Sequence, residues 1–103
     1  MATKEHLVKA AVKALFHKYD VYYAMPMGTG YGKSGVPDFL ACCAGRFLAV
    51  EAKAGKGTTT ALQDRELAAI RTAGGAALVI NESNIHELEN TINRLQALHT
   101  AGA

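Results

Sequence analysis

Three charged residues, Asp38, Glu51 and Lys53, stand in two neighbouring apolar runs of this sequence. If Ala44-Gly45 between the runs is a two-residue turn, the runs pair as a β-hairpin in which Asp38 lies opposite Glu51. Lys53 shares their face because side chains on a strand alternate with a period of two. A three-residue turn would shift the register and separate the carboxylates unless a bulge restored it. The spacing thus favours a carboxylate pair beside an ammonium group.

A close pair of carboxylates calls for a cation. Two ionised carboxylates about 4 Å apart repel by roughly 4 kcal/mol at an effective dielectric constant of about 20, so the pair needs a proton or a cation. No His or Cys stands at ligand spacing nearby, and oxygen ligands alone favour Mg²⁺ or Mn²⁺ over zinc. Alternatively, Asp38 caps a turn, and Glu51 and Lys53 belong to an ordinary solvated charge alternation. Asp is rare in strands, and both acids interrupt strongly apolar runs, which weighs against this alternative.

Hydrophobic patterning predicts the elements that must position these residues. It indicates three helices and four strands in the order αβββαβα. The predicted helices cover residues 4–18, 61–73 and 84–99, and the predicted strands cover residues 21–27, 36–43, 46–53 and 76–80. Thr3 is the predicted N-cap of the first helix, and Gly74-Gly75 is the predicted stop of the second.

Length and composition limit the possible functions. The chain has 103 residues, half of them hydrophobic and 19% charged, which indicates one folded domain. Its net charge of +2 is far below the basic excess of a purely electrostatic DNA binder. The charge is uneven, however: residues 1–57 carry +4 and residues 58–103 carry −2, so a polyanion is expected to bind the first half.

Cysteine usage and hydropathy indicate the cellular compartment that we expect for this protein. The two cysteines, Cys42 and Cys43, are adjacent and cannot easily form an unstrained disulfide with each other, which indicates a reducing, cytosolic setting. No apolar run approaches the roughly 18–20 residues needed to span a bilayer, and the N-terminus lacks the apolar region of a signal peptide. We therefore expect a soluble cytoplasmic protein without a membrane partner.

A glycine-rich loop over residues 28–35 contains two partial nucleotide-binding motifs. Residues 30–35 match G-x-G-x-x-G, but the sequence that follows predicts a strand where a dinucleotide site requires a helix. Gly32-Lys33-Ser34 ends like a phosphate-binding loop that is one residue too short. A plain connecting loop explains the composition, although Lys33 and Tyr31 could close on a nucleic-acid backbone.

The chemistry-bearing residues, taken in order, resemble a known pattern. Glu5 in the first helix, the tetrapeptide GVPD at residues 35–38, the tripeptide EAK at residues 51–53 and Gln63 together resemble the PD-(D/E)XK nuclease superfamily. More narrowly, they resemble its VRR-NUC (virus-type replication-repair nuclease) family in the small, stand-alone, phage-like form. The resemblance runs from about residue 4 to residue 80, and the predicted order αβββαβ is the core order of that superfamily.

This resemblance implies a fold and an activity. Residues 1–103 would form a single nuclease domain of the α/β class, with a restriction-endonuclease-like core, a mixed sheet flanked by helices, and an additional C-terminal helix. The activity would be that of a Mg²⁺-dependent DNA endonuclease, with Mn²⁺ able to substitute, acting on branched DNA such as four-way (Holliday) junctions. Stand-alone members commonly act as homodimers, and the setting would be the cytoplasm of a bacterial or phage-infected host cell.

The resemblance also implies a ligand set for the metal. Asp38 and Glu51 would be the primary ligands, joined by the backbone carbonyl of Ala52, and Glu5 would bind or orient the metal through water. Glu5 has an ordinary alternative as the i, i+4 partner of Lys9 on the first helix.

Two further residues acquire catalytic roles from the resemblance. Lys53 would position or activate the attacking water and steady the charge that develops on the phosphate, and Gln63 would assist beside it. Gln63 could instead complete a capping box with Thr60 at the start of the second predicted helix, and the two roles are compatible. Tyr31, Lys33 and Lys56 are the candidate DNA contacts.

Other functions remain open at this stage. The protein could be a flap or repair-type nuclease, or a non-catalytic nucleic-acid-binding module that keeps the fold and the basic first half. A binding module gains nothing from carboxylates that face phosphates, so the acidic pair weighs against it. A third possibility is an assembly protein joined through the apolar stripe of the last helix, a stripe that could equally pack within the fold.

Overall fold

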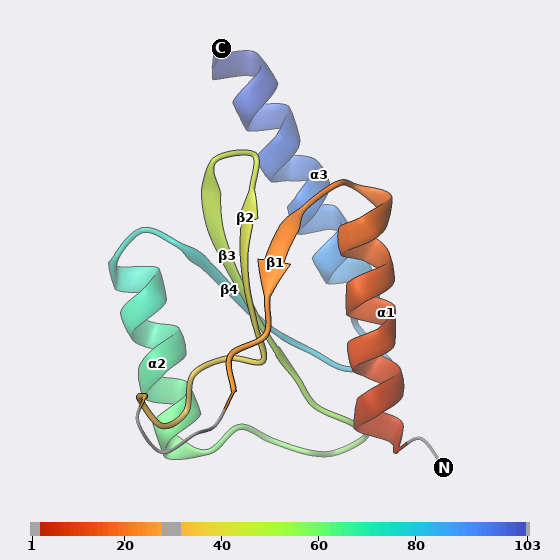
Figure 1. The fold of residues 1–103 in the computed structure, drawn as a ribbon, viewed down its shortest axis with the longest axis vertical. Helices are drawn as coiled ribbons and strands as arrows, with labels where there is room; N and C mark the ends of the chain where they lie inside the picture. Colours follow the sequence, from red (N-terminus) through yellow and green to blue (C-terminus); the bar gives the residue numbers. More distant parts are fainter. Residues whose placement is uncertain (1–2, 28–31, 103) are drawn as a thin grey trace.

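The structure is a computed structural model that describes residues 3–27 and 32–102. It contains a four-stranded sheet with helices on both faces (Figure 1). The elements in chain order are α1 (Lys4–Lys18), β1 (Tyr22–Ala24), β2 (Phe39–Cys43), β3 (Arg46–Ala52), α2 (Ala61–Thr72), β4 (Ala76–Ile80) and α3 (Ile85–Gly102). The predicted order αβββαβα and the α/β class with a mixed sheet, flanking helices and a C-terminal helix are confirmed. No helix in residues 3–27 and 32–102 is long and apolar enough to cross a membrane.

The sheet is mixed, with strand order β1-β2-β3-β4. Strands β1, β2 and β3 are antiparallel neighbours, whereas β4 runs parallel to β3. A parallel neighbour requires a crossover connection, and α2 supplies it. Residues 53–60 connect β3 to α2, and the first turn of α2 lies at the same end of the sheet as the end of β3 (Figure 1).

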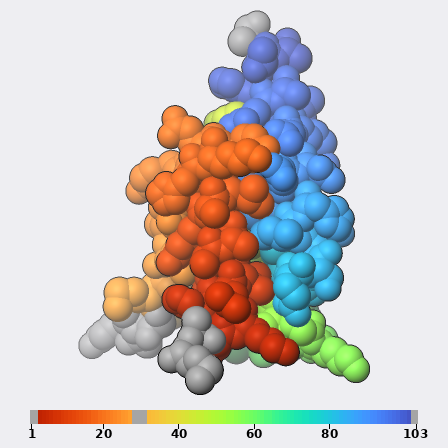
Figure 2. Space-filling view, turned by 90° about the vertical axis from the view of Figure 1, so that its right-hand side faces the viewer, coloured from red at the N-terminus to blue at the C-terminus, as the bar shows by residue number. Residues whose placement is uncertain are grey.

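Two apolar layers hold the helices to the sheet. Helices α1 and α3 cover one face, and they lie side by side in Figure 2. Their core includes fully buried Phe16, Phe39 and Ile92. Helix α2 covers the other face through Leu67, which packs with Ala49 and its neighbours. The sheet is therefore buried on both sides, which explains why β3 is apolar almost throughout.

The hairpin has the predicted two-residue turn. Ala44 and Gly45 have φ angles of 51° and 81°, the pair of positive values that a type I′ turn requires. The register runs from Cys43 opposite Arg46 to Phe39 opposite Val50. Extended by one step beyond β2, this register brings residue 38 opposite residue 51, as the sequence predicts.

Two predicted strands are shorter than expected. The strand predicted over residues 21–27 is reduced to Tyr22–Ala24, and the strand predicted from residue 36 begins at Phe39. Each lost segment contains a proline, Pro26 or Pro37, which has no backbone N–H to donate to a ladder. The shortening of β2 leaves Asp38 just outside the ladder, so its backbone N–H is free for another acceptor.

Gly35 allows the chain before Asp38 to lie against the start of α2. Its φ angle is +83°, and a Cβ atom at this position would lie 2.5 Å from both the carbonyl carbon and the carbonyl oxygen of Leu62, and 2.9 Å from the backbone nitrogen of Gln63. Only glycine fits both the left-handed conformation and this close approach to backbone atoms. Gly35 therefore fixes the approach of the segment that carries Asp38 to the helix turn that carries Gln63.

We expect Gly35→Ala to lower the free energy of unfolding by roughly 2–4 kcal/mol. The alanine would be strained in the left-handed conformation, and its Cβ atom would also clash with the backbone of α2. Gly32→Ala is the matched control in the same loop, since a Cβ atom there would meet nothing within 4 Å. It should change stability by no more than about 0.5 kcal/mol. Urea unfolding followed by circular dichroism measures both, and equal effects of the two substitutions would contradict the assigned role of Gly35.

Candidate active site

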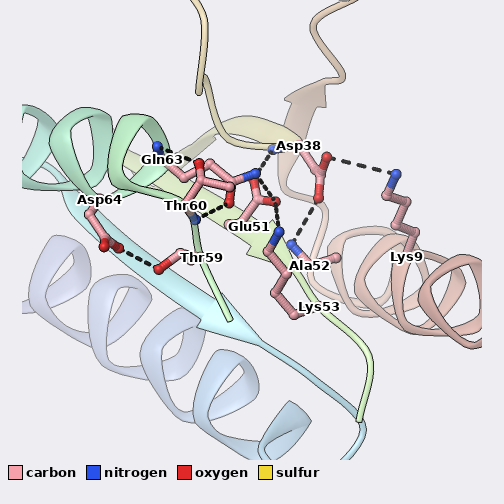
Figure 3. A network of polar contacts seen from close by, with 9 residues as sticks. All are labelled: Lys9, Asp38, Glu51, Ala52, Lys53, Thr59, Thr60, Gln63 and Asp64. Atoms are coloured by element: carbon pink, nitrogen blue, oxygen red, sulfur yellow. Dashed lines mark hydrogen bonds and ion pairs between the residues drawn. The ribbon is translucent and has the colours of Figure 1, made fainter. Parts of the chain in front are cut away.

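The predicted site residues converge where β3 ends. Asp38 immediately precedes β2, Glu51 and Ala52 are the last residues of β3, Lys53 follows them, and Gln63 lies in the first turn of α2. Figure 3 shows these side chains pointing toward one another, with Lys9 approaching from α1. The hairpin register and the crossover to α2 thus place residues from four parts of the chain in one cluster.

Two backbone hydrogen bonds hold the Asp38 and Glu51 carboxylates in place. The backbone N–H of Asp38 donates to Glu51 Oε1 at 3.2 Å. The backbone N–H of Ala52 donates to Asp38 Oδ2 at 2.9 Å. Each carboxylate therefore has one oxygen held by a backbone donor beside the other acid, which fixes the pair without a cation between them.

Two lysines supply positive charge beside the carboxylates. Lys53 Nζ lies 3.7 Å from Glu51 Oε2, and Lys9 Nζ lies 3.7 Å from Asp38 Oδ1. Both separations exceed hydrogen-bond length, so these are ion pairs without direct hydrogen bonds. Lys53 is the more enclosed of the two lysines, with 15% of its side chain exposed against 28% for Lys9.

Gln63 forms the capping box considered for it in the sequence, and its side chain also reaches the acidic pair. Its backbone N–H donates to Thr60 Oγ1 and its Oε1 accepts from the Thr60 backbone N–H, which forms the capping box of α2. Its Nε2 donates to Glu51 Oε2 at 3.1 Å. The cap orients the amide, and the amide then reaches the carboxylate, so the start of α2 is connected directly to the acidic pair.

Burial makes Glu51 an unusual acid. Its residue is only 3% exposed, and removal from water together with the neighbouring charge of Asp38 raises the pKa of Glu51 from 4.5 to about 7, partly offset by Lys53. Because the folded-state pKa lies above the unfolded value, the metal-free protein is stabilised when Glu51 is protonated. That contribution is present at low pH and is lost as the pH rises through about 7.

The cluster fits a hard divalent cation in the chemistry of its donors. Asp38 and Glu51 offer carboxylate oxygens, and the Ala52 carbonyl faces the Asp38 side of β3, because the N–H and C=O of one strand residue point the same way. Mg²⁺ is often held by one or two carboxylates together with water and phosphate oxygens. Over residues 3–27 and 32–102, no three His, Cys, Asp or Glu side chains form a metal-binding group. The expected role of Glu5, which would bind or orient the metal through water, stays a prediction.

The ion pair of Lys9 bears on the Glu5–Lys9 pairing considered in the sequence, and it adds Lys9 to the candidate site. Lys9 pairs with Asp38 and not with Glu5, so the i, i+4 pair considered for α1 does not form. Sequence reasoning assigned Lys9 no role in the site. The only available signal was its position one turn after Glu5, itself placed at the border of the apolar stripe of α1.

Of the candidate DNA contacts, Lys33 and Lys56 are exposed and Tyr31 is not described by the structure. Lys33 is 74% exposed and lies 3.9 Å from Glu66 of α2. Lys56 is exposed in the connection between β3 and α2. Tyr31 lies outside the described residues.

Comparison with known proteins adds no assignment. No family model, no curated protein and no solved structure matches this chain. The site itself combines two close carboxylates, a backbone carbonyl, two ammonium groups and an amide. Such a group of residues can bind a divalent cation and a phosphate oxygen together.

We expect divalent-metal binding to release a proton. Glu51, with a pKa of about 7, must ionise to act as a ligand, so affinity for Mn²⁺ should rise with pH up to about 7 and then level off. Calorimetry in two buffers of different ionisation enthalpy should detect proton release near pH 6.5 and almost none near pH 8.5. Glu51→Gln is expected to abolish both metal binding and proton release. Affinity that is unchanged between those pH values would contradict the assignment of Glu51 as a ligand.

Proposed function

We propose that this protein is a Mg²⁺-dependent DNA endonuclease of the VRR-NUC family, with the restriction-endonuclease-like core of the PD-(D/E)XK superfamily. The observation that carries the proposal is the contact between Asp38 and Glu51 at the end of the hairpin. Lys53 forms an ion pair with Glu51, and Gln63 donates a hydrogen bond to it. The element order and the mixed sheet agree with that core. The proposed substrate is branched DNA such as a four-way junction.

The protein's own residues account for binding the cation and the water. Asp38, Glu51 and the Ala52 carbonyl would hold Mg²⁺, or Mn²⁺ in its place. At these residues a bound cation would supply polarisation of a phosphoryl group and a lower pKa for a nearby water molecule. Lys53, fixed 3.7 Å from Glu51, donates to the attacking water or to the phosphate oxygen on which charge develops. Gln63 holds Glu51 in place through its amide N–H.

The quaternary structure and setting form part of the same proposal. Resolution of a four-way junction requires two cuts, and one chain offers one pair of carboxylates, so we propose a homodimer that presents two sites. We propose the cytoplasm of a bacterial or phage-infected cell as the setting. The free thiols of Cys42 and Cys43 support a reducing environment.

Asp38→Asn and Lys53→Met should each lower Mg²⁺-dependent cleavage of a four-way junction by about a thousandfold or more, because each removes charge from the reacting centre. Asp38→Asn keeps an oxygen for the Ala52 N–H, so the fold should persist. Asp20→Asn is the matched control: Asp20 is exposed, and its φ angle of 57° suits Asn. Gel assays with junction, flap and linear duplex, in Mg²⁺ or EDTA, measure the activity.

The same assay separates the competing functions. Paired symmetric nicks in the junction support the proposal, whereas cutting of the flap alone indicates a repair-type nuclease. Binding without cutting by the wild-type protein indicates a non-catalytic module. Wild-type activity in both Asp38→Asn and Lys53→Met would contradict the proposed site.

The dimer is tested separately by sedimentation velocity. We expect the purified protein to sediment as a dimer at micromolar concentration, both alone and on the junction. A monomer that retains full, paired junction cleavage under the same conditions would contradict the proposed homodimer.

A further inference from the structure

The four carboxylate oxygens of the acidic pair differ in how they are held. Asp38 Oδ2 accepts from the Ala52 N–H, and Glu51 Oε1 accepts from the Asp38 N–H. Glu51 Oε2 accepts from Gln63 and lies beside Lys53. Asp38 Oδ1 alone has no hydrogen-bond donor from the residues that the structure describes; its partner there is the Lys9 ammonium at 3.7 Å.

The contact between Lys9 and Asp38 is the most easily broken of the set. Its length excludes a direct hydrogen bond, and both side chains are about a quarter exposed, at 28% and 24%. Partly exposed ion pairs of this kind contribute little stability, because solvent screens them and the long side chain loses rotamer freedom. Lys9 can therefore leave Asp38 at small cost when a stronger cation arrives.

A divalent cation on the pair would compete with Lys9 for the same oxygen. Asp38 Oδ1 is the oxygen of that residue not already hydrogen-bonded to the backbone, so it is the one more open to a metal held by Asp38. Two positive charges on one oxygen repel, and the flexible lysine is the one that moves. Lys9 extends from α1, so its freed ammonium remains at the rim of the site. In Figure 3, Lys9 and Gln63 lie on opposite sides of the acidic pair.

We propose that Lys9 is a phosphate-binding residue of this site, held by Asp38 in the metal-free protein and released to a DNA phosphate when a divalent cation binds. This inference rests on the proposed function. It follows from charge: the cation neutralises the two carboxylates, which leaves the ammonium groups of Lys9 and Lys53 for a phosphate anion. Lys53 stays beside Glu51, and Lys9 holds a phosphate on the α1 side.

The test compares Lys9→Met with Lys18→Met. Methionine keeps most of the length of the stem and removes the charge. Lys18 is the matched control because it lies on the same helix and forms an ion pair of its own, with Glu89 at 2.9 Å. Lys9→Arg restores a cation and should recover phosphate binding. Circular dichroism verifies that each variant is folded.

Two measurements are expected to change in opposite directions for Lys9→Met. Affinity for Mn²⁺ alone, measured by electron paramagnetic resonance, should rise by about two- to fivefold. This is the factor that corresponds to the stabilisation by a partly exposed ion pair, which the metal no longer has to break. Affinity for a four-way junction in Ca²⁺, which permits binding without cleavage, should fall. The slope of log affinity against log salt should become shallower by about 0.9, the loss of one phosphate contact. Lys18→Met should alter neither quantity.

The outcomes separate this inference from the proposed function. Tighter Mn²⁺ binding with an unchanged salt slope would overturn it, because Lys9 would then only neutralise the metal-free site. Unchanged values for both quantities would also overturn it, even if the wild-type protein cleaves junctions. A wild-type protein that binds Mn²⁺ but no DNA would overturn the proposed function and the phosphate role together.

Discussion

The buried carboxylate of Glu51 is the constraint on which the rest of the site depends. It lies at the end of a strand enclosed on both faces, beside a second acid, where ionisation is opposed both by burial and by the charge of Asp38. Such a group is costly to a small domain unless protons, cations and donors surround it. The Asp38 N–H and the Gln63 amide donate hydrogen bonds to Glu51, and the Lys53 ammonium lies beside it, so its neighbours offset part of this cost.

Each neighbouring element contributes one partner to the acidic pair. The segment before β2 provides the Asp38 N–H, β3 provides the Ala52 N–H, α2 provides Gln63 and α1 provides Lys9. The fold is arranged so that these elements meet: the hairpin sets Asp38 opposite Glu51, and the crossover returns α2 to the end of β3. Because Gly35 has no side chain, the loop before Asp38 can lie against α2.

Much of this arrangement follows from local sequence rules. The turn at Ala44-Gly45 determines the register, and the register determines the acidic pair, so both were predictable from spacing. The capping box of α2 is likewise local, which is why the cap formed by Thr60 and Gln63 could be foreseen. The pairing of Lys9 with Asp38 was not predictable in this way. It joins residues far apart in sequence, and it depends on how α1 packs on the sheet, which no local pattern specifies.

The ends of the strands also depended on Pro26 and Pro37, whose effect on the ladder outweighed the apolar pattern.

Anomalous diffraction from crystals soaked in Mn²⁺ at a pH above 7 tests whether Asp38 and Glu51 form the proposed divalent-metal site. We predict a manganese peak within coordination distance of Asp38 Oδ1, a Glu51 oxygen and the Ala52 carbonyl, with Lys9 displaced from Asp38. Saturating Mn²⁺ that leaves the position between the two carboxylates empty, with Lys9 still paired to Asp38, would contradict it.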